Sequence, residues 1–260
     1  MNNITTYNIL SKYYKYIYNH QVQSDNSVNN YLDFIINNIK IKQKFLDIGC
    51  GTGIFTEKLF MHFKISYGID PCKDMLEQVK FNSNIKYKNL YLNDLKNKNF
   101  DLITSFSQVI NHLKNYDDLF NFIKDSSEKL NENGLFYFDV FNNKYFDYNK
   151  PNSLKRELEK NIYYSINPEK LEKFNDYTLM ILNNFIYDNS KKYQYKLDIY
   201  MWDIDLLLKI CELNNLKLIN ITKMLNLNEK DINNSHKISL LFKKMKRIDL
   251  IPNKKINKKN

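Results

Sequence analysis

Between residues 41 and 141 of this chain, short apolar segments alternate with longer amphipathic ones. Such alternation is typical of β-α-β units, in which right-handed crossovers place helices on both faces of one parallel sheet. The pattern therefore predicts a doubly wound α/β fold. The predicted strands are Lys44–Ile48, Ile65–Ile69, Ile85–Leu92, Phe100–Phe106 and Gly134–Phe141, and the predicted helices are Phe55–Phe63, Lys73–Lys80 and Tyr116–Leu130.

The flanking regions follow other patterns. Residues 4–40 place aromatic and aliphatic side chains at helical spacing, which predicts two helices separated near Ser24–Ser27. After Phe141 the alternation stops, and short strands around Asp188-Asn189-Ser190, a turn-forming sequence, predict a small antiparallel sheet. Its predicted strands are Ile162–Tyr164, Tyr177–Tyr187 and Tyr193–Tyr200; the helix Asp203–Asn214 and the strands Leu216–Thr222 and Lys237–Lys244 then complete a mostly parallel sheet of seven strands.

Composition limits the classes of function. The chain has 260 residues and a formal charge of +10, which raises nucleic acid or an anionic membrane as partners. Lys, however, is spread over the whole chain, Arg occurs only at Arg156 and Arg247, and only residues 243–260 form a strongly basic segment. The three cysteines have no paired spacing and the histidines are scattered, so we expect neither a disulfide framework nor a metal site.

The most informative segment follows the first predicted strand. It contains three of only 5 glycines, as Asp47-Ile-Gly49-Cys50-Gly51-Thr-Gly53, directly before a predicted helix. Glycines at a strand end let a ligand approach the backbone closely, so we expect a nucleoside-type site at the carboxyl edge of the sheet. Because Ile54 occupies the third glycine position of the dinucleotide fingerprint and no P-loop sequence is present, neither of those phosphate sites is indicated.

This loop resembles the first motif of the class I methyltransferases that use S-adenosylmethionine (SAM) and release S-adenosylhomocysteine. Gly68-Ile-Asp70-Pro71 resembles the second motif, which implies that Asp70 takes both ribose hydroxyls and that Met75 packs on the adenine. Asn93-Asp94-Leu95 resembles the segment whose acid accepts from the adenine amino group. The resemblance implies cofactor contacts by Tyr14, Asp47, Gly49, Cys50, Gly51, Asp70, Pro71, Met75, Asp94, Leu95 and Ser105.

Within this superfamily, the segments Asp101–Leu113 and Phe138–Asn142 are similar to small-molecule N-methyltransferases of the amino-sugar type. That resemblance implies an N-terminal helical lid at residues 1–40, a SAM-binding core at 41–145 and 201–245, a β-rich insert over the acceptor at 146–200, and a basic tail at 246–260. It also implies that His112 faces the acceptor, where an imidazole with the usual pKa near 6.5 would accept a proton or orient a lone pair.

The sequence thus predicts a methyltransferase that acts on an amine or hydroxyl of a small molecule. Two alternatives stay open. One is an RNA methyltransferase, although Ser105-Phe-Ser-Gln108 differs from the Asn/Asp-Pro-Pro-Tyr/Phe segment typical of base-amino methyltransferases; the other is a non-catalytic SAM-binding protein. Because no segment has the apolar length of a signal peptide core or membrane span, we expect a cytoplasmic protein without a membrane partner, as a monomer or homodimer.

Overall fold

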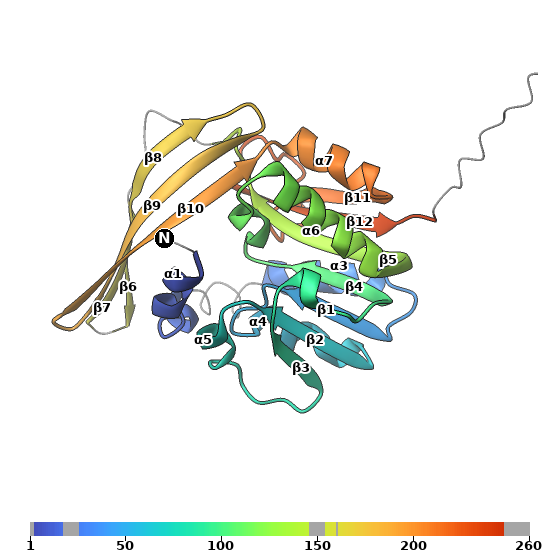
Figure 1. The fold of residues 1–260 in the computed structure, drawn as a ribbon, viewed down its shortest axis with the longest axis horizontal. Coiled ribbons are helices and arrows are strands. Elements are labelled where there is room, and N and C mark those ends of the chain that lie inside the picture. Colours follow the sequence, from blue (N-terminus) through green and yellow to red (C-terminus); the bar gives the residue numbers. More distant parts are fainter. Residues whose placement is uncertain (1–2, 18–25, 146–153, 160, 247–260) are drawn as a thin grey trace, which may run out of the picture.

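The structure, a computed structural model, describes residues 3–17, 26–145, 154–159 and 161–246. Its centre is a seven-stranded sheet with the strand order β11-β12-β5-β4-β1-β2-β3, in which β12 alone runs antiparallel to β5 and β11 (Figure 1). These strands are β1 (Lys44–Ile48), β2 (Ile65–Asp70), β3 (Ile85–Asn89), β4 (Phe100–Ser105), β5 (Leu130–Phe141), β11 (Leu216–Lys223) and β12 (Lys237–Lys244). The prediction of a doubly wound, mostly parallel sheet is confirmed.

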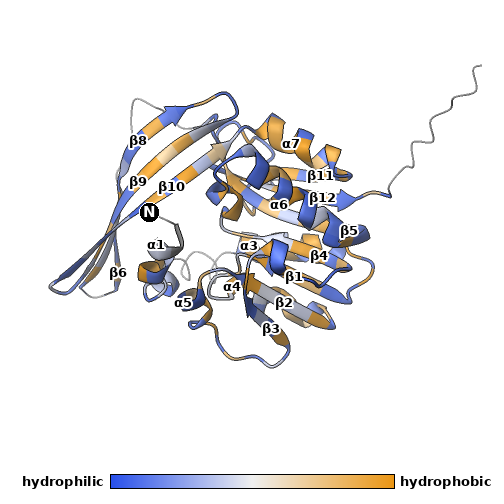
Figure 2. Ribbon diagram, viewed as in Figure 1, coloured by the Kyte–Doolittle hydropathy of each residue, from blue (hydrophilic) through white to orange (hydrophobic). Residues whose placement is uncertain are grey.

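Helices cover both faces of this sheet. One face packs on α6 (Tyr116–Lys129) and α7 (Ile204–Leu213), and the other packs on α3 (Asn26–Asn37) and α4 (Ile54–Leu59). Each face forms a separate hydrophobic cluster with its helices. The central strands are buried along nearly all of their length, because helices cover them on both sides. Figure 2 shows hydrophobic residues among the strands of this sheet. The remaining helices are α1 (Asn3–Leu10), α5 (Lys73–Leu76) and the short 3-10 helices η1 (Phe60–His62), η2 (Leu92–Asp94) and η3 (Val109–His112).

Polar side chains define where α6 and α7 begin. The Asn115 side chain accepts a hydrogen bond from the backbone N–H of Asp118 at 2.8 Å and so caps α6. Asp203 caps α7 in the same way, accepting from the N–H groups of Asp205 and Leu206. A side-chain oxygen at this position satisfies N–H groups that have no partner within the helix. The helix predicted from Asp203 therefore begins one residue later, with Asp203 as its cap.

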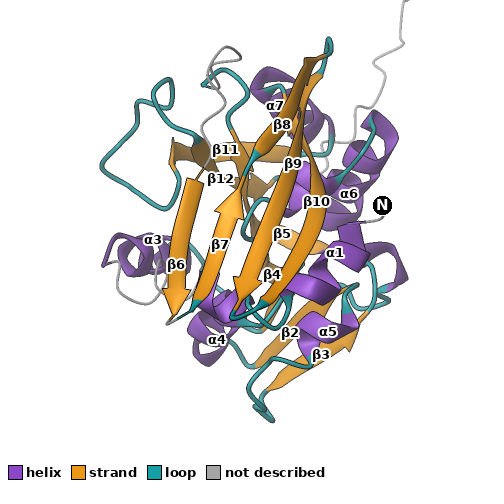
Figure 3. Ribbon diagram, turned by 90° about the vertical axis from the view of Figure 1, so that its left-hand side faces the viewer, coloured by secondary structure: helices purple, strands orange, loops and turns teal. Residues whose placement is uncertain are grey.

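A second, antiparallel sheet stands beside the first (Figures 1 and 3). Along β9 and β10 buried residues alternate with more exposed ones, because one face packs on the N-terminal segment and the other is turned away from it. The turn predicted at Asp188–Ser190 joins these two strands, with Asn189 in the left-handed region. The strands are β6 (Leu154–Glu159), β7 (Ile162–Ile166), β8 (Pro168–Lys173), β9 (Tyr177–Asp188) and β10 (Lys191–Trp202); β6 and β8 were not predicted.

The N-terminal segment lies between the two sheets. Helix α1 contacts β10 on one side and α5 on the other, and the Thr6 hydroxyl donates to the Lys196 carbonyl at 2.9 Å. Residues 14–17 are helical again after a turn at residues 11–13, so the first predicted helix is interrupted. Parts of the predicted helix break, the insert boundary and the basic tail lie outside the described residues. None of the helices in the described ranges has the length and hydropathy needed to cross a bilayer.

Candidate functional site

The glycine loop after β1 adopts a conformation that favours glycine. Gly49, Gly51 and Gly53 have φ angles of 66°, 55° and 80°, in the left-handed region that other residues enter at a cost. A Cβ at Gly49 would lie 2.5 Å from the Cγ2 atom of Val109, and one at Gly51 would lie 3.0 Å from the Cε atom of Met75. The loop is therefore held close to the segments that follow β4 and β2.

Asp70, at the carboxyl end of β2, fixes this loop. Its Oδ2 atom accepts a hydrogen bond from the backbone N–H of Gly51, and its Oδ1 atom accepts one from Cys72, both at 2.8 Å. Burial raises the pKa of the Asp70 carboxyl, and the two N–H donors oppose that shift. Because a carboxylate has about four acceptor positions, Asp70 retains capacity for two ligand hydroxyls.

Asp47 lies at the end of β1, buried beneath the loop. Its two oxygens accept hydrogen bonds from the hydroxyls of Thr56 at 2.7 Å and Thr104 at 2.8 Å. Burial raises the pKa of Asp47 to about 7, although both hydroxyls lower it. The group is therefore partly protonated near neutral pH, and a nearby cation would favour its carboxylate form.

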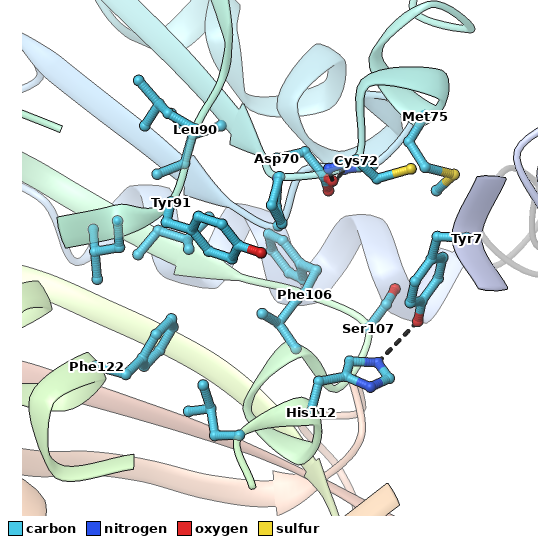
Figure 4. A pocket seen from close by; sticks show the side chains of 18 of the residues that line it. Tyr7, Asp70, Cys72, Met75, Leu90, Tyr91, Phe106, Ser107, His112 and Phe122 are labelled. Atoms are coloured by element: carbon cyan, nitrogen blue, oxygen red, sulfur yellow. Dashed lines mark hydrogen bonds between the residues drawn. The ribbon is translucent and has the colours of Figure 1, made fainter. Parts of the chain in front are cut away.

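A cavity opens where these strand ends meet. Figure 4 shows Tyr7 and His112 at one end of it, Leu90, Tyr91 and Phe122 at the other, and Asp70 between them. A second, smaller hollow includes Asp47 and Cys50 and shares Tyr14, Gly49, Phe106 and Ser107 with the first, so the two adjoin. The arrangement follows the rule that ligands of open α/β sheets bind at the carboxyl ends of the strands.

His112 and Tyr7 form a polar pair at one end of the cavity. The Tyr7 hydroxyl lies 2.8 Å from the Nε2 atom of His112, and the two rings meet edge to face with centroids 5.5 Å apart. Burial lowers the pKa of His112 to about 4, so the imidazole is neutral at physiological pH. The reference pKa of 6.5 therefore does not describe this ring, because its burial disfavours the charged form.

The loop after β4 is held by Asp139 of β5. Its carboxylate accepts from the backbone N–H of Ser107 at 3.0 Å, from that of Gln108 at 2.6 Å, and from the Gln108 side-chain amide at 2.5 Å. Ser107 and Gln108 have φ angles of 64° and 61°, a costly conformation for two successive residues that are not glycine. Asp139 thus stabilises the backbone that carries Ser107, Val109 and His112 to the cavity.

Most of the predicted site residues line these hollows. The main cavity includes Tyr14, Gly49, Gly51, Asp70, Pro71, Met75 and His112, and the smaller one adds Asp47 and Cys50. Ser105 lines neither hollow: it is fully buried as the last residue of β4, and Phe106 and Ser107 reach the cavity instead. Cofactor contact by each of these residues stays a prediction.

Asp94 and Leu95 are also not among the residues that line the cavity. Asp94 is exposed at the end of η2, and Leu95 is buried in the core, where its carbonyl accepts from the Lys129 ammonium at 2.7 Å. The lining residues at this end are Leu90, Tyr91 and Leu92. The physical reason is that β3 ends at Asn89 rather than at the predicted Leu92, so the residues that face the cavity come three positions earlier.

Sequence reasoning missed Tyr7, Tyr91 and Ser107. Tyr7 and Tyr14 both belong to the first predicted helix and both line the cavity, although a turn at residues 11–13 separates them. No local signal identified the contact between Tyr7 and His112, because the two residues are 105 positions apart.

The fold and the position of the site define a class I methyltransferase. A family model described as a methyltransferase domain matches residues 18–180, which is more than half of the chain. The chain therefore belongs to the methyltransferase domain family. The predicted superfamily and its cofactor, SAM, are confirmed at the level of this family.

Solved structures share the fold. A SAM-dependent methyltransferase from Clostridium acetobutylicum has a TM-score of 0.72 at 23% identity, over 90% of this chain and 98% of that one. The SAM-bound amino pentose methyltransferase CalS10 from Micromonospora echinaspora has a TM-score of 0.68 at 13% identity, over 88% of this chain and 96% of that one.

One curated relative resembles part of the sequence. The ubiquinone biosynthesis O-methyltransferase of Pelagibacter ubique is 34% identical over 105 residues, which are 38% of this chain and 42% of that protein. The match thus spans less than half the length of that relative.

Proposed function

We propose that this chain transfers the methyl group of SAM to an amine or hydroxyl of a small molecule. The observation that carries the proposal is one cavity at the carboxyl edge of the parallel sheet, with Asp70 and the glycine loop on its wall and the Tyr7–His112 pair at one end. A donor held by the loop and an acceptor next to His112 would then meet in a single enclosure.

The residues present fit SAM. Asp70 retains lone pairs for both ribose hydroxyls, and the missing side chain of Gly51 leaves space beside Met75 and Tyr14. SAM would supply an electrophilic methyl group, and its sulfonium departs as a neutral thioether. Since little new charge develops, the chain acts chiefly by orienting the two reactants, an effect that can supply roughly 7–11 kcal/mol of the barrier.

His112 is better suited to orient an acceptor than to deprotonate an ammonium. With a pKa of about 4, it would take a proton from an ammonium of ordinary pKa at a cost of roughly 8 kcal/mol. As a neutral ring bonded to Tyr7, it would instead hold the acceptor by a hydrogen bond while a neutral amine or hydroxyl presents its lone pair. The proposed catalytic contribution of His112 is therefore positional.

The antiparallel sheet is proposed to cover the acceptor. Tyr164 of β7 belongs to the same hydrophobic cluster as Leu10 and Tyr13 of the N-terminal segment, and Tyr7 packs against that cluster. We assign residues 146–200 to this cover, 1–40 to the lid, 41–145 and 201–245 to the SAM-binding core, and 246–260 to a tail. The sugar N-methyltransferase neighbours support an amine acceptor, and the O-methyltransferase relative supports a hydroxyl.

Labelled SAM tests the proposal. We expect micromolar binding of SAM and S-adenosylhomocysteine in calorimetry, and label transfer to at least one amine or phenol in a panel of small acceptors. Transfer to RNA alone would favour the RNA methyltransferase alternative, and binding without transfer to either would favour a non-catalytic protein. Absence of SAM binding would contradict the proposal that this chain uses SAM as its methyl donor.

A further inference from the structure

Two side chains from distant parts of the sequence bind the backbone of β10. Thr6 of α1 donates its hydroxyl hydrogen to the carbonyl of Lys196 at 2.9 Å. Asn111 of η3 donates a hydrogen of its amide Nδ2 to the carbonyl of Tyr200 at 2.7 Å. Both side chains are buried, Thr6 with 2% of its surface exposed and Asn111 with none, so water competes little for either contact.

Both carbonyls lie on the same edge of β10. Lys196 and Tyr200 are four positions apart, and alternate residues of a strand turn their carbonyls to the same side. Asn183 of β9 faces Lys196 but donates its own N–H to Asn167, so the Lys196 carbonyl points away from β9. This edge of β10 is not paired with another described strand, and along it the two contacts lie roughly 13 Å apart.

Asn111 also joins this edge to the seven-stranded sheet. Its Oδ1 atom accepts a hydrogen bond from the backbone N–H of Phe141, the last residue of β5, at 3.0 Å. Since an N–H only donates and a carbonyl only accepts, these two partners fix the orientation of the amide. The turn η3 is therefore held to both sheets one residue before His112.

Each of the two contacts directly precedes one member of the Tyr7–His112 pair. Tyr7 follows Thr6 in α1. His112 follows Asn111 in η3, and its Nε2 atom lies 2.8 Å from the Tyr7 hydroxyl. The inference rests on the proposed function, in which this pair orients the acceptor. We propose that Thr6 and Asn111 are positioning residues that use the edge of β10 as a common support for the pair.

Nuclear magnetic resonance of the histidine rings tests this role without an acceptor. Burial lowers the pKa of His112 to about 4 in the wild type, and the signal of this ring is assigned by its loss in His112→Asn. Thr6→Val removes the hydroxyl but keeps the shape of the side chain. We expect a less tightly held, more hydrated ring, whose pKa rises toward 6.5 by about one unit or more. Thr6→Ser, which keeps the hydroxyl, should titrate like the wild type.

Two further variants separate positioning from stability. Asn111→Asp still accepts from β5 but no longer donates to β10, so it should raise the pKa of His112 as Thr6→Val does. Asn142→Asp is the matched control, because the buried Asn142 amide donates to two backbone carbonyls before β12 and lies outside η3. It should lower the thermal stability without moving the His112 titration.

The outcomes decide between a support and a merely stabilising contact. An unchanged His112 titration in folded Thr6→Val would overturn the inference, and so would an equal shift in Thr6→Ser or in Asn142→Asp. If thermal unfolding shows that Asn111→Asp is not folded, Thr6→Val alone decides. Failure of the proposed function would show differently: the wild type would not bind S-adenosylhomocysteine in calorimetry, whereas the His112 titration reports on the pair with or without a ligand.

Discussion

The strand-end carboxylates of the seven-stranded sheet and one buried amide of the five-stranded sheet differ in their hydrogen bonding. In the seven-stranded sheet, the carboxylates at the strand ends are all paired: Asp47 with two hydroxyls, Asp70 with two N–H groups and Asp139 with three N–H donors. In the five-stranded sheet, Asn184 is fully buried on the inner face of β9, and its amide nitrogen and oxygen have no hydrogen-bond partner among the described residues.

The polar groups around the cavity are therefore arranged in advance, whereas the Asn184 amide lacks a partner among the described residues. The loops around the cofactor cavity are held in place by their own hydrogen bonds, as preorganised binding requires. A buried amide without a partner costs about 1–3 kcal/mol, and it persists where something else compensates. The strand-end carboxylates around the cavity are thus paired within the chain, whereas the Asn184 amide of the antiparallel sheet is not paired with a described residue.

The largest expected effect concerns Asp70 at the carboxyl end of β2. Asp70→Ala removes the proposed acceptor for both ribose hydroxyls and leaves the N–H groups of Gly51 and Cys72 without their partner. Charge-assisted hydrogen bonds contribute about 1.5–3 kcal/mol each, so we expect SAM affinity in calorimetry to fall by at least about a hundredfold. Glu77→Ala, on the exposed side of the same segment, is the control and should stay within about twofold. Equal affinities for both variants would mean that Asp70 does not bind SAM.

The two sheets also differ in how much of each could be predicted from the sequence. The bounds of β1 and β12 were predicted to the residue, because apolar strands between turn signals are encoded locally. Strands β6 and β8 were missed. Their sequences, LKRELE and PEKLEK, are rich in Lys and Glu, which favour helices, and they are strands because they pair at the sides of β7 and β9.

The candidate site divides in the same way. The glycine loop and Asp70 belong to short motifs, and their positions follow from the ends of β1 and β2. Tyr7 reaches His112 only through the packing of α1 between the two sheets, which no local pattern encodes. Tyr91 was missed because the end of β3 was placed three residues too late; Asp94 was predicted from its resemblance to a family motif, and that contact stays a prediction.

The prediction of intermediate size concerns the pH dependence of stability that His112 causes. Burial depresses the pKa of this ring to about 4 from the usual 6.5, so the unfolded chain binds the proton more readily. Stability from this group is therefore fully present above about pH 6.5 and is lost as pH falls toward 4, by about 3 kcal/mol in total. His112→Asn should lack this loss, and the difference between its denaturation curves and those of wild type across this range measures it.

Asp47 changes stability in the opposite direction but cancels in that difference, because both proteins contain it. Its pKa, raised to about 7 by burial, contributes stability at low pH that is lost as pH rises through 7. A difference curve that is flat between pH 4 and 6.5 would mean that His112 is solvated, and would return it to the role of a base near neutral pH.

The smallest expected effect concerns the buried Asn184 amide of the antiparallel sheet. Asn184→Leu replaces the buried amide by an apolar side chain of similar size, so an amide without a partner predicts a gain of about 1 kcal/mol in the free energy of unfolding. Asn183→Leu, its neighbour on the opposite face of β9, is the matched control and should change stability by less than about 0.5 kcal/mol. Both variants should keep the SAM affinity of wild type, since neither residue lines the cofactor cavity. If Asn184 binds the acceptor, the more stable Asn184→Leu variant should also show a KM for acceptor raised about tenfold. A loss of stability in this variant would instead reveal a protein partner for the amide, and would remove the contrast between the two sheets.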